Sequence, residues 1–318
     1  MKTKIVYAVV SSNEDTYIEQ ALISAYSVRL HNPETTIELV TDNDTESTLT
    51  GNRAKIKEYV SKIISIDVPN EFSIKQRSRY LKTNIRRFVT GDYLFLDTDT
   101  IVCASLSEVD DIPYEICAVR EQNKYNKFSK DDGWMYELAC KVGLEKELRD
   151  QKYFNSGVMY VKDVPNAYVF YDKWYDCWTK LNMKGLSTDQ TALCWANKLI
   201  GGVVKHIDDS WNCQIKRKGF YQADKAKILH YYYGAEKCEL IVAQEETLNT
   251  IKEIGFIPVL IKQYIENPLR GFVVDYDEMK FQKGSCDIKY LYNKQSSVYK
   301  MILFICKLTV SITSRWIR

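Results

Sequence analysis

Short, continuous apolar runs alternate with helical patterns along most of the chain. The first run is residues 5–10 (IVYAVV), and a helical repeat of apolar residues follows it between residues 18 and 28. Further strands are predicted at residues 36–40, 62–68, 93–96, 115–119, 157–161, 202–207 and 227–232. Strands that are apolar throughout are buried on both faces. The pattern therefore predicts an α/β fold with a mostly parallel central sheet flanked by helices.

Residues 238–318 are less regular and more helical, so we expect a main domain of residues 1–237 and a C-terminal helical extension. The chain has 318 residues and is 45% hydrophobic, which suits one large α/β unit with an appendage. Its formal net charge of +2 argues against a nucleic-acid partner. No apolar run reaches the roughly 20 residues that span a bilayer.

The cysteines and the N-terminus predict a cellular compartment. The nine cysteines are scattered, without a C-x-x-C pair or a zinc-type Cys/His spacing. The apolar stretch before Ser11 has only six residues, which predicts a first strand and not an export signal. We therefore expect a cytoplasmic protein whose thiols stay reduced.

Two carboxylates, Asp97 and Asp99, follow the apolar run YLFL directly. Residues two apart on a strand point to the same face, so both could aim at one point. They are either polar residues of a turn or ligands of a cation that holds substrate phosphates. In parallel sheets ligands bind at the carboxyl ends of strands, which favours the second interpretation. His230 ends the strand-like KILH, and two carboxylates with an imidazole suit Mn²⁺ better than Mg²⁺ or Zn²⁺.

Three further segments have a structural and a functional interpretation. A basic stripe at helical spacing is formed by Arg79, Lys82 and Arg86. This stripe either binds a diphosphate or is a solvated helix face, and for Arg86 we favour the solvated face. The sequence STDQ at residues 187–190 fits a capping box, with Gln190 reaching back to Ser187. Residues 155–157 (NSG) are typical of a turn before a strand.

Several enzyme classes lack their motifs in this chain. No G-x-x-x-x-G-K-[ST] loop is present, no G-x-G-x-x-G follows the first strand, and no G-x-S-x-G occurs. These absences argue against a P-loop nucleotidase, a dinucleotide oxidoreductase and an ordinary serine hydrolase.

The segments taken in order resemble glycosyltransferase family 8, which includes glycogenin and bacterial lipopolysaccharide galactosyl- and glucosyltransferases. The resemblance rests on residues 5–28, SRYLKT, YLFLDTDTIV, YFNSGVMYV, STDQTAL, DDSWN and ILHYYYG. It implies the GT-A fold and transfer of a hexose from UDP-glucose or UDP-galactose, with retention of configuration. The acceptor would be a saccharide or glycolipid of bacterial surface polysaccharide synthesis, such as lipopolysaccharide or capsule.

The resemblance also implies roles for particular residues. The metal ligands would be Asp97, Asp99 and His230, holding Mn²⁺ or, as an alternative, Mg²⁺. The donor-binding residues would be Ala8 beside the nucleoside, Arg79 or Lys82 with Lys237 at the phosphates, and Asn155 at the sugar. The catalytic pair would be Asp189 and Gln190.

Two departures from the family pattern concern the segment after His230. His230 and Gly234 are one residue further apart than is usual, and Cys238 and Glu239 replace the Pro-Trp that often follows the lysine. A sugar-nucleotide pyrophosphorylase would need a glycine-rich basic loop after the first strand, where SSNEDTY has no glycine. A non-catalytic nucleotide- or glycan-binding module on the same fold is the other alternative.

The C-terminal residues 296–318 predict a basic amphipathic helix with four basic residues and no acid. Such a helix either docks on the core or lies on an anionic membrane surface. The second possibility would suit an enzyme at the cytoplasmic face of the cell membrane with a lipid-linked acceptor.

Overall fold

The computed structural model describes residues 1–124, 127–216, 218–231 and 240–273. Met1–Gly271 forms one compact unit, and of the second unit, Phe272–Arg318, only residues 272 and 273 are described. The domain boundary expected after residue 237 therefore stays a prediction, and the helix expected at 296–318 lies outside the described residues. Among the residues that are described, no helix is long and apolar enough to cross a membrane.

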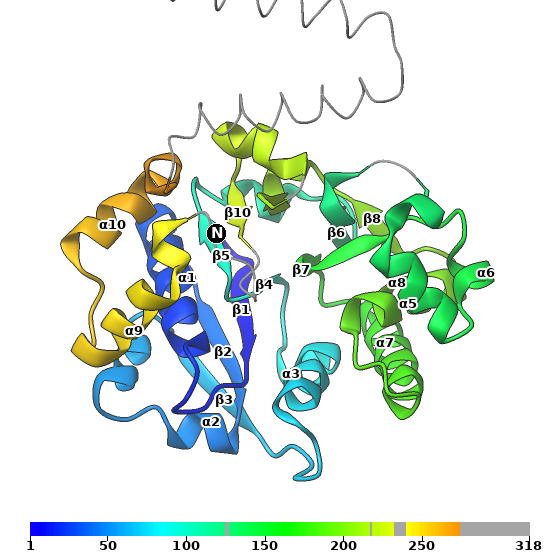
Figure 1. Cartoon of the computed structure of the whole chain (residues 1–318), viewed down its shortest axis with the longest axis horizontal. Helices are drawn as coiled ribbons and strands as arrows, with labels where there is room; N and C mark the ends of the chain where they lie inside the picture. The colour runs from blue at the N-terminus through cyan, green and yellow to red at the C-terminus, as the bar shows by residue number, and fades with distance from the viewer. Residues whose placement is uncertain (125–126, 217, 232–239, 274–318) are drawn as a thin grey trace, which may run out of the picture. The chain divides into compact units, whose positions relative to one another are not determined.

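The described part of the chain contains a seven-stranded mixed sheet in the order β3-β2-β1-β4-β7-β6-β8 (Figure 1). Only β7 runs against its neighbours β4 and β6, so the sheet is mostly parallel, as predicted. The strands of this sheet are β1 (Lys4–Val9), β2 (Ile37–Asp42), β3 (Lys62–Ile66), β4 (Tyr93–Leu96), β6 (Ile116–Arg120), β7 (Phe154–Val161) and β8 (Val204–His206).

A second, three-stranded sheet has the order β5-β10-β9. Its strands are β5 (Thr100–Val102), β9 (Cys213–Gln214) and β10 (Ile228–His230). The run at 227–232 is thus a strand, but it belongs to this small sheet. Since β5 follows β4 after a short turn, the small sheet starts at the carboxyl edge of the large one.

Helices cover both faces of the large sheet. Val6, Phe95 and Met159 belong to a core cluster that contains Trp174 and Trp178 of α7. On the opposite face, the Tyr7 hydroxyl lies 2.8 Å from that of Ser24 in α1. The helices are α1 (Tyr17–His31), α2 (Asn43–Ser47), α3 (Ile74–Thr83), α4 (Ile85–Phe88), α5 (Trp134–Lys141), α6 (Glu145–Leu148), α7 (Pro165–Met183), α8 (Asp189–Leu199), α9 (Glu245–Ile254) and α10 (Val259–Glu266). Continuous apolar strands such as IVYAVV are explained by burial from both sides.

The helices α9 and α10 pack against α1, beside the first strands (Figure 1). The Lys252 ammonium donates to the carbonyl of Asp15, 2.8 Å away, and so ties α9 to the loop after β1. The segment after residue 238 is helical in its described part, as the sequence indicates.

Two local predictions are wrong. Arg86 is buried and not solvated: its guanidinium lies 4.9 Å from the centre of the Tyr93 ring and donates to the Gly91 carbonyl at 2.9 Å. The helical stripe is interrupted because α3 ends at Thr83 and Arg86 belongs to the separate α4. Residues 155–157 are not a turn but lie inside β7, whose pairing with β6 reaches Phe154, opposite Arg120.

Candidate active site

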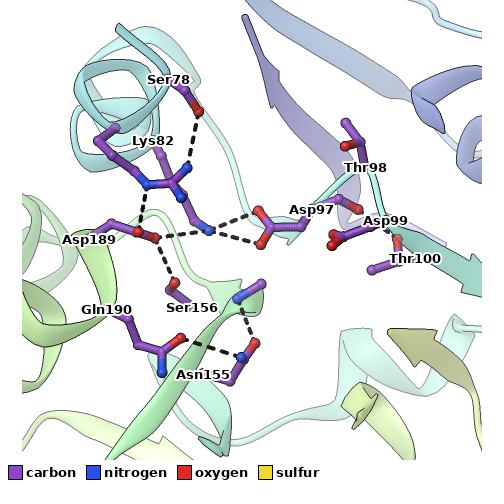
Figure 2. A network of polar contacts seen from close by, with 12 residues as sticks. Ser78, Lys82, Asp97, Thr98, Asp99, Thr100, Asn155, Ser156, Asp189 and Gln190 are labelled. Carbon is purple, nitrogen blue, oxygen red and sulfur yellow. Dashed lines mark hydrogen bonds and ion pairs between the residues drawn. The ribbon is translucent and has the colours of Figure 1, made fainter. Parts of the chain in front are cut away.

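The two predicted aspartates lie where β4 ends and the chain turns into β5 (Figure 2). Backbone bonds hold this turn from both sides: the Asp97 N–H donates to the Gly157 carbonyl at 2.7 Å, and the Tyr231 N–H donates to the Asp99 carbonyl at 3.0 Å. The Thr100 hydroxyl also donates to the Asp97 carbonyl at 2.8 Å. The carboxylates therefore project from a fixed backbone.

The pairing of β10 with β5 brings His230 to the aspartates. His230 lies opposite Thr100 in the register, and its Nε2 is 3.2 Å from Asp99 Oδ1. Asp97, Asp99 and His230 each offer a ligand atom, and these atoms lie within 4.8 Å of one another. Two carboxylate oxygens and one imidazole nitrogen on a fixed backbone fit a divalent metal ion.

The charges of this cluster shift the pKa values of its members. Burial alone would lower the pKa of His230, but Asp99 and Asp97 outweigh burial and raise it. Burial raises the pKa of Asp97, and the Asp99 charge adds to that rise against the opposing effect of Lys82. A divalent cation bound by the cluster would therefore compete with protons for these groups.

Gly157 of β7 lies directly against the cluster. A Cβ added at this position would lie 2.3 Å from His230 Cε1 and 2.8 Å from Asp97 Oδ2. No real side chain tolerates such distances, so the strand can approach the aspartate and the histidine only because residue 157 has no side chain.

Two cations of α3 lie beside the cluster, and the structure separates their positions. Lys82 is buried: its Nζ is 2.8 Å from Asp97 Oδ1 and 3.1 Å from Asp189 Oδ2. Arg79 lines the cavity beside the aspartates, and its Nε lies 2.8 Å from Asp189 Oδ1. Lys82 bridges two acidic residues, whereas Arg79 lines the cavity together with Lys75.

Asp189 and Gln190 begin α8 and both point into the site (Figure 2). The Ser156 hydroxyl donates to Asp189 Oδ2 at 2.7 Å. Burial would raise the pKa of Asp189, but Arg79 and Lys82 outweigh burial and hold it below its ordinary range. The carboxylate is therefore charged at neutral pH.

The predicted capping box at residues 187–190 is wrong. Thr188 precedes the first helical residue and makes no side-chain cap bond. Gln190 Nε2 instead donates to Glu121 Oε2 at 2.7 Å. The glutamine is thus turned away from the helix start and toward an acidic residue that directly follows β6.

Glu121 is a site residue that the sequence analysis missed. Its buried carboxylate accepts hydrogen bonds at 2.7 Å from both Asn155 Nδ2 and Gln190 Nε2. Its N–H donates to the Tyr153 carbonyl at 2.9 Å, which ties the end of β6 to the start of β7. The signal was available, because Glu121 follows the apolar run of β6 much as Asp97 follows that of β4.

A cavity of about 450 Å³ opens beside the aspartates. Ala8 lines it, as expected, and so do Val9 and Val10 at the end of β1. Tyr17 and Gln20 of α1 line the same cavity and were not predicted. Tyr17 is 39% exposed, and its ring provides a flat apolar surface in this cavity. Lys237, the remaining predicted residue, lies outside the described residues.

The sequence profile named Glycosyl transferase family 8 matches residues 8–238. The chain belongs to this family. No curated protein matches the sequence.

Solved structures of glycosyltransferases are similar to this family-8 chain. The galactosyltransferase LgtC, solved with donor and acceptor sugar analogues, is 17% identical with a TM-score of 0.50, covering 82% of this chain and 99% of its own. The glycosyltransferase GlyE of Streptococcus pneumoniae TIGR4 is 18% identical with a TM-score of 0.51, covering 84% of this chain and 65% of its own. The GT-A fold is thereby confirmed. Family membership also confirms the predicted enzyme class, a glycosyltransferase.

Proposed function

We propose that this family-8 enzyme transfers a hexose from UDP-glucose or UDP-galactose to a saccharide or glycolipid acceptor, with retention and with Mn²⁺ as cofactor. The observation that carries the proposal is the cluster of Asp97, Asp99 and His230 at the edge of the cavity. When bound there, a divalent cation would hold the donor's diphosphate and stabilise the charge that develops as the sugar leaves. Mg²⁺ is the alternative ion.

The cavity residues suit the rest of a nucleotide-sugar donor. Tyr17 offers a face on which a base can stack, and Ala8 leaves room for the nucleoside beside it. Arg79 lines the cavity and pairs with Asp189, so its guanidinium would contact a phosphate oxygen of the donor. Asn155, Asp189 and Gln190 would then meet the sugar, whose hydroxyls need both donors and acceptors.

Retention requires either a covalent intermediate or attack on the face from which the leaving group departs. Gln190 is an uncharged amide and a poor nucleophile. Asp189 is held by Arg79 and Ser156, and Glu121 accepts two hydrogen bonds from amides, which lowers the nucleophilicity of both carboxylates. These contacts support the second route.

In that route the bond between sugar C1 and the phosphate oxygen breaks while the acceptor oxygen bonds to C1. The acceptor's proton passes to the departing phosphate, and the residues around the sugar stabilise its oxocarbenium character. A glycosyl adduct trapped on Asp189 or Glu121 of the wild-type enzyme would overturn this route.

The test of the proposed function is a thermal-shift screen of nucleotide sugars with and without Mn²⁺, followed by a donor-hydrolysis assay. A ligand that binds only the folded state raises the apparent stability. We expect a UDP-hexose to give the largest shift and to need Mn²⁺. Asp99→Asn should abolish both the Mn²⁺-dependent shift and turnover, whereas Asp172→Asn, at an exposed surface position, should change neither. Equal shifts for UDP-sugars with and without Mn²⁺ would contradict the metal assignment.

The acceptor side is less defined by the described residues. The proposed lipid-linked acceptor, the peripheral contact of residues 296–318 with an anionic membrane and the cytoplasmic location stay predictions from the sequence. They agree with a site that opens at the surface and with a pathway of bacterial surface polysaccharide synthesis.

A further inference from the structure

Asn212 lies directly behind the predicted metal ligand His230. It ends the short 3-10 helix Asp209–Asn212 and is fully buried. Its side-chain Oδ1 is 3.0 Å from His230 Nδ1, and its Nδ2 donates to Asn155 Oδ1 at 2.8 Å. The Asn212 amide therefore contacts both the predicted metal ligand His230 and Asn155, the residue proposed to meet the sugar.

The orientation of this amide is fixed by groups with only one possible hydrogen-bond role. The Gly157 backbone N–H can only donate, and it bonds to Asn155 Oδ1 at 2.8 Å. The Glu121 carboxylate accepts from Asn155 Nδ2. Asn155 must therefore present its side-chain oxygen to Asn212. The NH₂ group of Asn212 donates to that oxygen, so the side-chain oxygen of Asn212 faces His230.

We propose that Asn212 is a positioning residue that fixes the tautomer of His230. An amide oxygen cannot donate, so the short contact requires the proton on Nδ1. Nε2, which faces Asp99, is then the nitrogen left for a metal ion. The inference rests on the proposed metal site, and it adds that the amides of Asn212 and Asn155 hold the imidazole in one orientation from behind.

The same contacts join the metal ligand to the residues around the sugar. From His230 the bonds run through Asn212 and Asn155 to Glu121, which also holds Gln190 (Figure 2 shows Asn155 beside Gln190). Loss of the Asn212 amide should therefore loosen the imidazole and also release one of the bonds that orient Asn155.

Three variants separate this role from simple structural support. Asn212→Ala removes both bonds, and Asn212→Asp keeps an acceptor for His230 while losing the donor to Asn155. Asn84→Ala is the matched control, because Asn84 is equally buried and its side chain donates to the Tyr80 carbonyl in α3. Calorimetric titration of the full chain with Mn²⁺ alone should show affinity reduced about 10–100-fold in Asn212→Ala. Asn212→Asp should stay within a few-fold of wild type, and Asn84→Ala should equal wild type even if it melts earlier.

A second measurement reads the tautomer directly and does not need the variants to fold. The chain has three histidines, so ¹⁵N-histidine labelling gives a simple spectrum. In the metal-free wild type at alkaline pH, we expect His230 Nδ1 to carry the proton. A proton on Nε2, or equal loss of Mn²⁺ affinity in Asn212→Ala and Asn84→Ala, would overturn the proposal. Wild-type protein that binds no Mn²⁺ would instead overturn the metal site and leave the tautomer result standing by itself.

Discussion

Replacing Gly157 with alanine should weaken metal binding while leaving the fold in place. The added Cβ would lie 2.3 Å from His230 Cε1, where carbon atoms normally stay at least about 3.5 Å apart. One of the two groups must move by roughly 1 Å. The backbone of β7 cannot yield easily, because it pairs with β4 and β6 on both sides, so the His230 ring has to leave its present position.

We expect this overpacking to cost about 1–3 kcal/mol of unfolding free energy. The larger effect should fall on metal binding, because metal–ligand distances tolerate only about 0.2 Å of error. Calorimetric titration with Mn²⁺ should therefore show affinity lower by a factor of about 10 or more, in the range seen when a metal ligand loses its support. Urea unfolding in EDTA would measure the stability change separately.

Gly143→Ala is the matched control for this substitution. Gly143 has a φ of +75°, but an added Cβ would meet nothing within 4 Å. It should lower stability by about 1–2 kcal/mol through backbone strain alone and leave Mn²⁺ affinity unchanged. If Gly157→Ala bound Mn²⁺ as tightly as the wild type, the close approach of β7 to the cluster would have no functional meaning.

Other substitutions test the charges around the site. Lys82→Met should destabilise the metal-free protein by about 3 kcal/mol, since it removes the buried cation that Asp97 and Asp189 share, and it should raise the affinity for Mn²⁺. Urea unfolding in EDTA and in Mn²⁺ should then show unequal losses of stability, and equal losses would count against this reasoning. Asp189→Asn should lower the free energy of unfolding by a constant amount at every pH above 3.8, the ordinary pKa of an aspartate. The difference between wild type and variant should shrink as the pH falls below 3.8, because the pKa of Asp189 in the folded protein is depressed. If the stability difference between wild type and Asp189→Asn persisted unchanged in acid, the charge of Asp189 would not be the cause of that difference. In alkylation followed by peptide mapping, Cys140 should react first among the described thiols, since burial raises the pKa of Cys103, Cys117, Cys177, Cys194 and Cys213.

The metal cluster was predictable because each ligand follows an apolar run. Asp97 and Asp99 come after YLFL, and His230 ends KILH, so both runs place polar groups where strands stop. What the runs could not reveal is that β10 joins a separate small sheet and pairs with β5. That pairing involves residues far apart in the chain, and its register is decided by packing.

Local motifs were less reliable, and two S-x-x-Q segments show why. Ser73 and Gln76 form a capping box at the start of α3, with the Gln76 side chain accepting from the Ser73 N–H at 2.8 Å. Ser187 and Gln190 have the same spacing and form none, because Gln190 bonds to Glu121. A carboxylate 69 positions away outcompetes the local cap, and no short window contains that information.

The hydrogen bond between the Glu121 N–H and the Tyr153 carbonyl closes the chain excursion that carries α5 and α6. Both ends of this excursion are fastened at the catalytic edge, while Phe128, Met135 and Leu148 of its interior belong to the hydrophobic core. A segment grafted from a relative would therefore have to keep these buried apolar positions, even where its exposed residues differ.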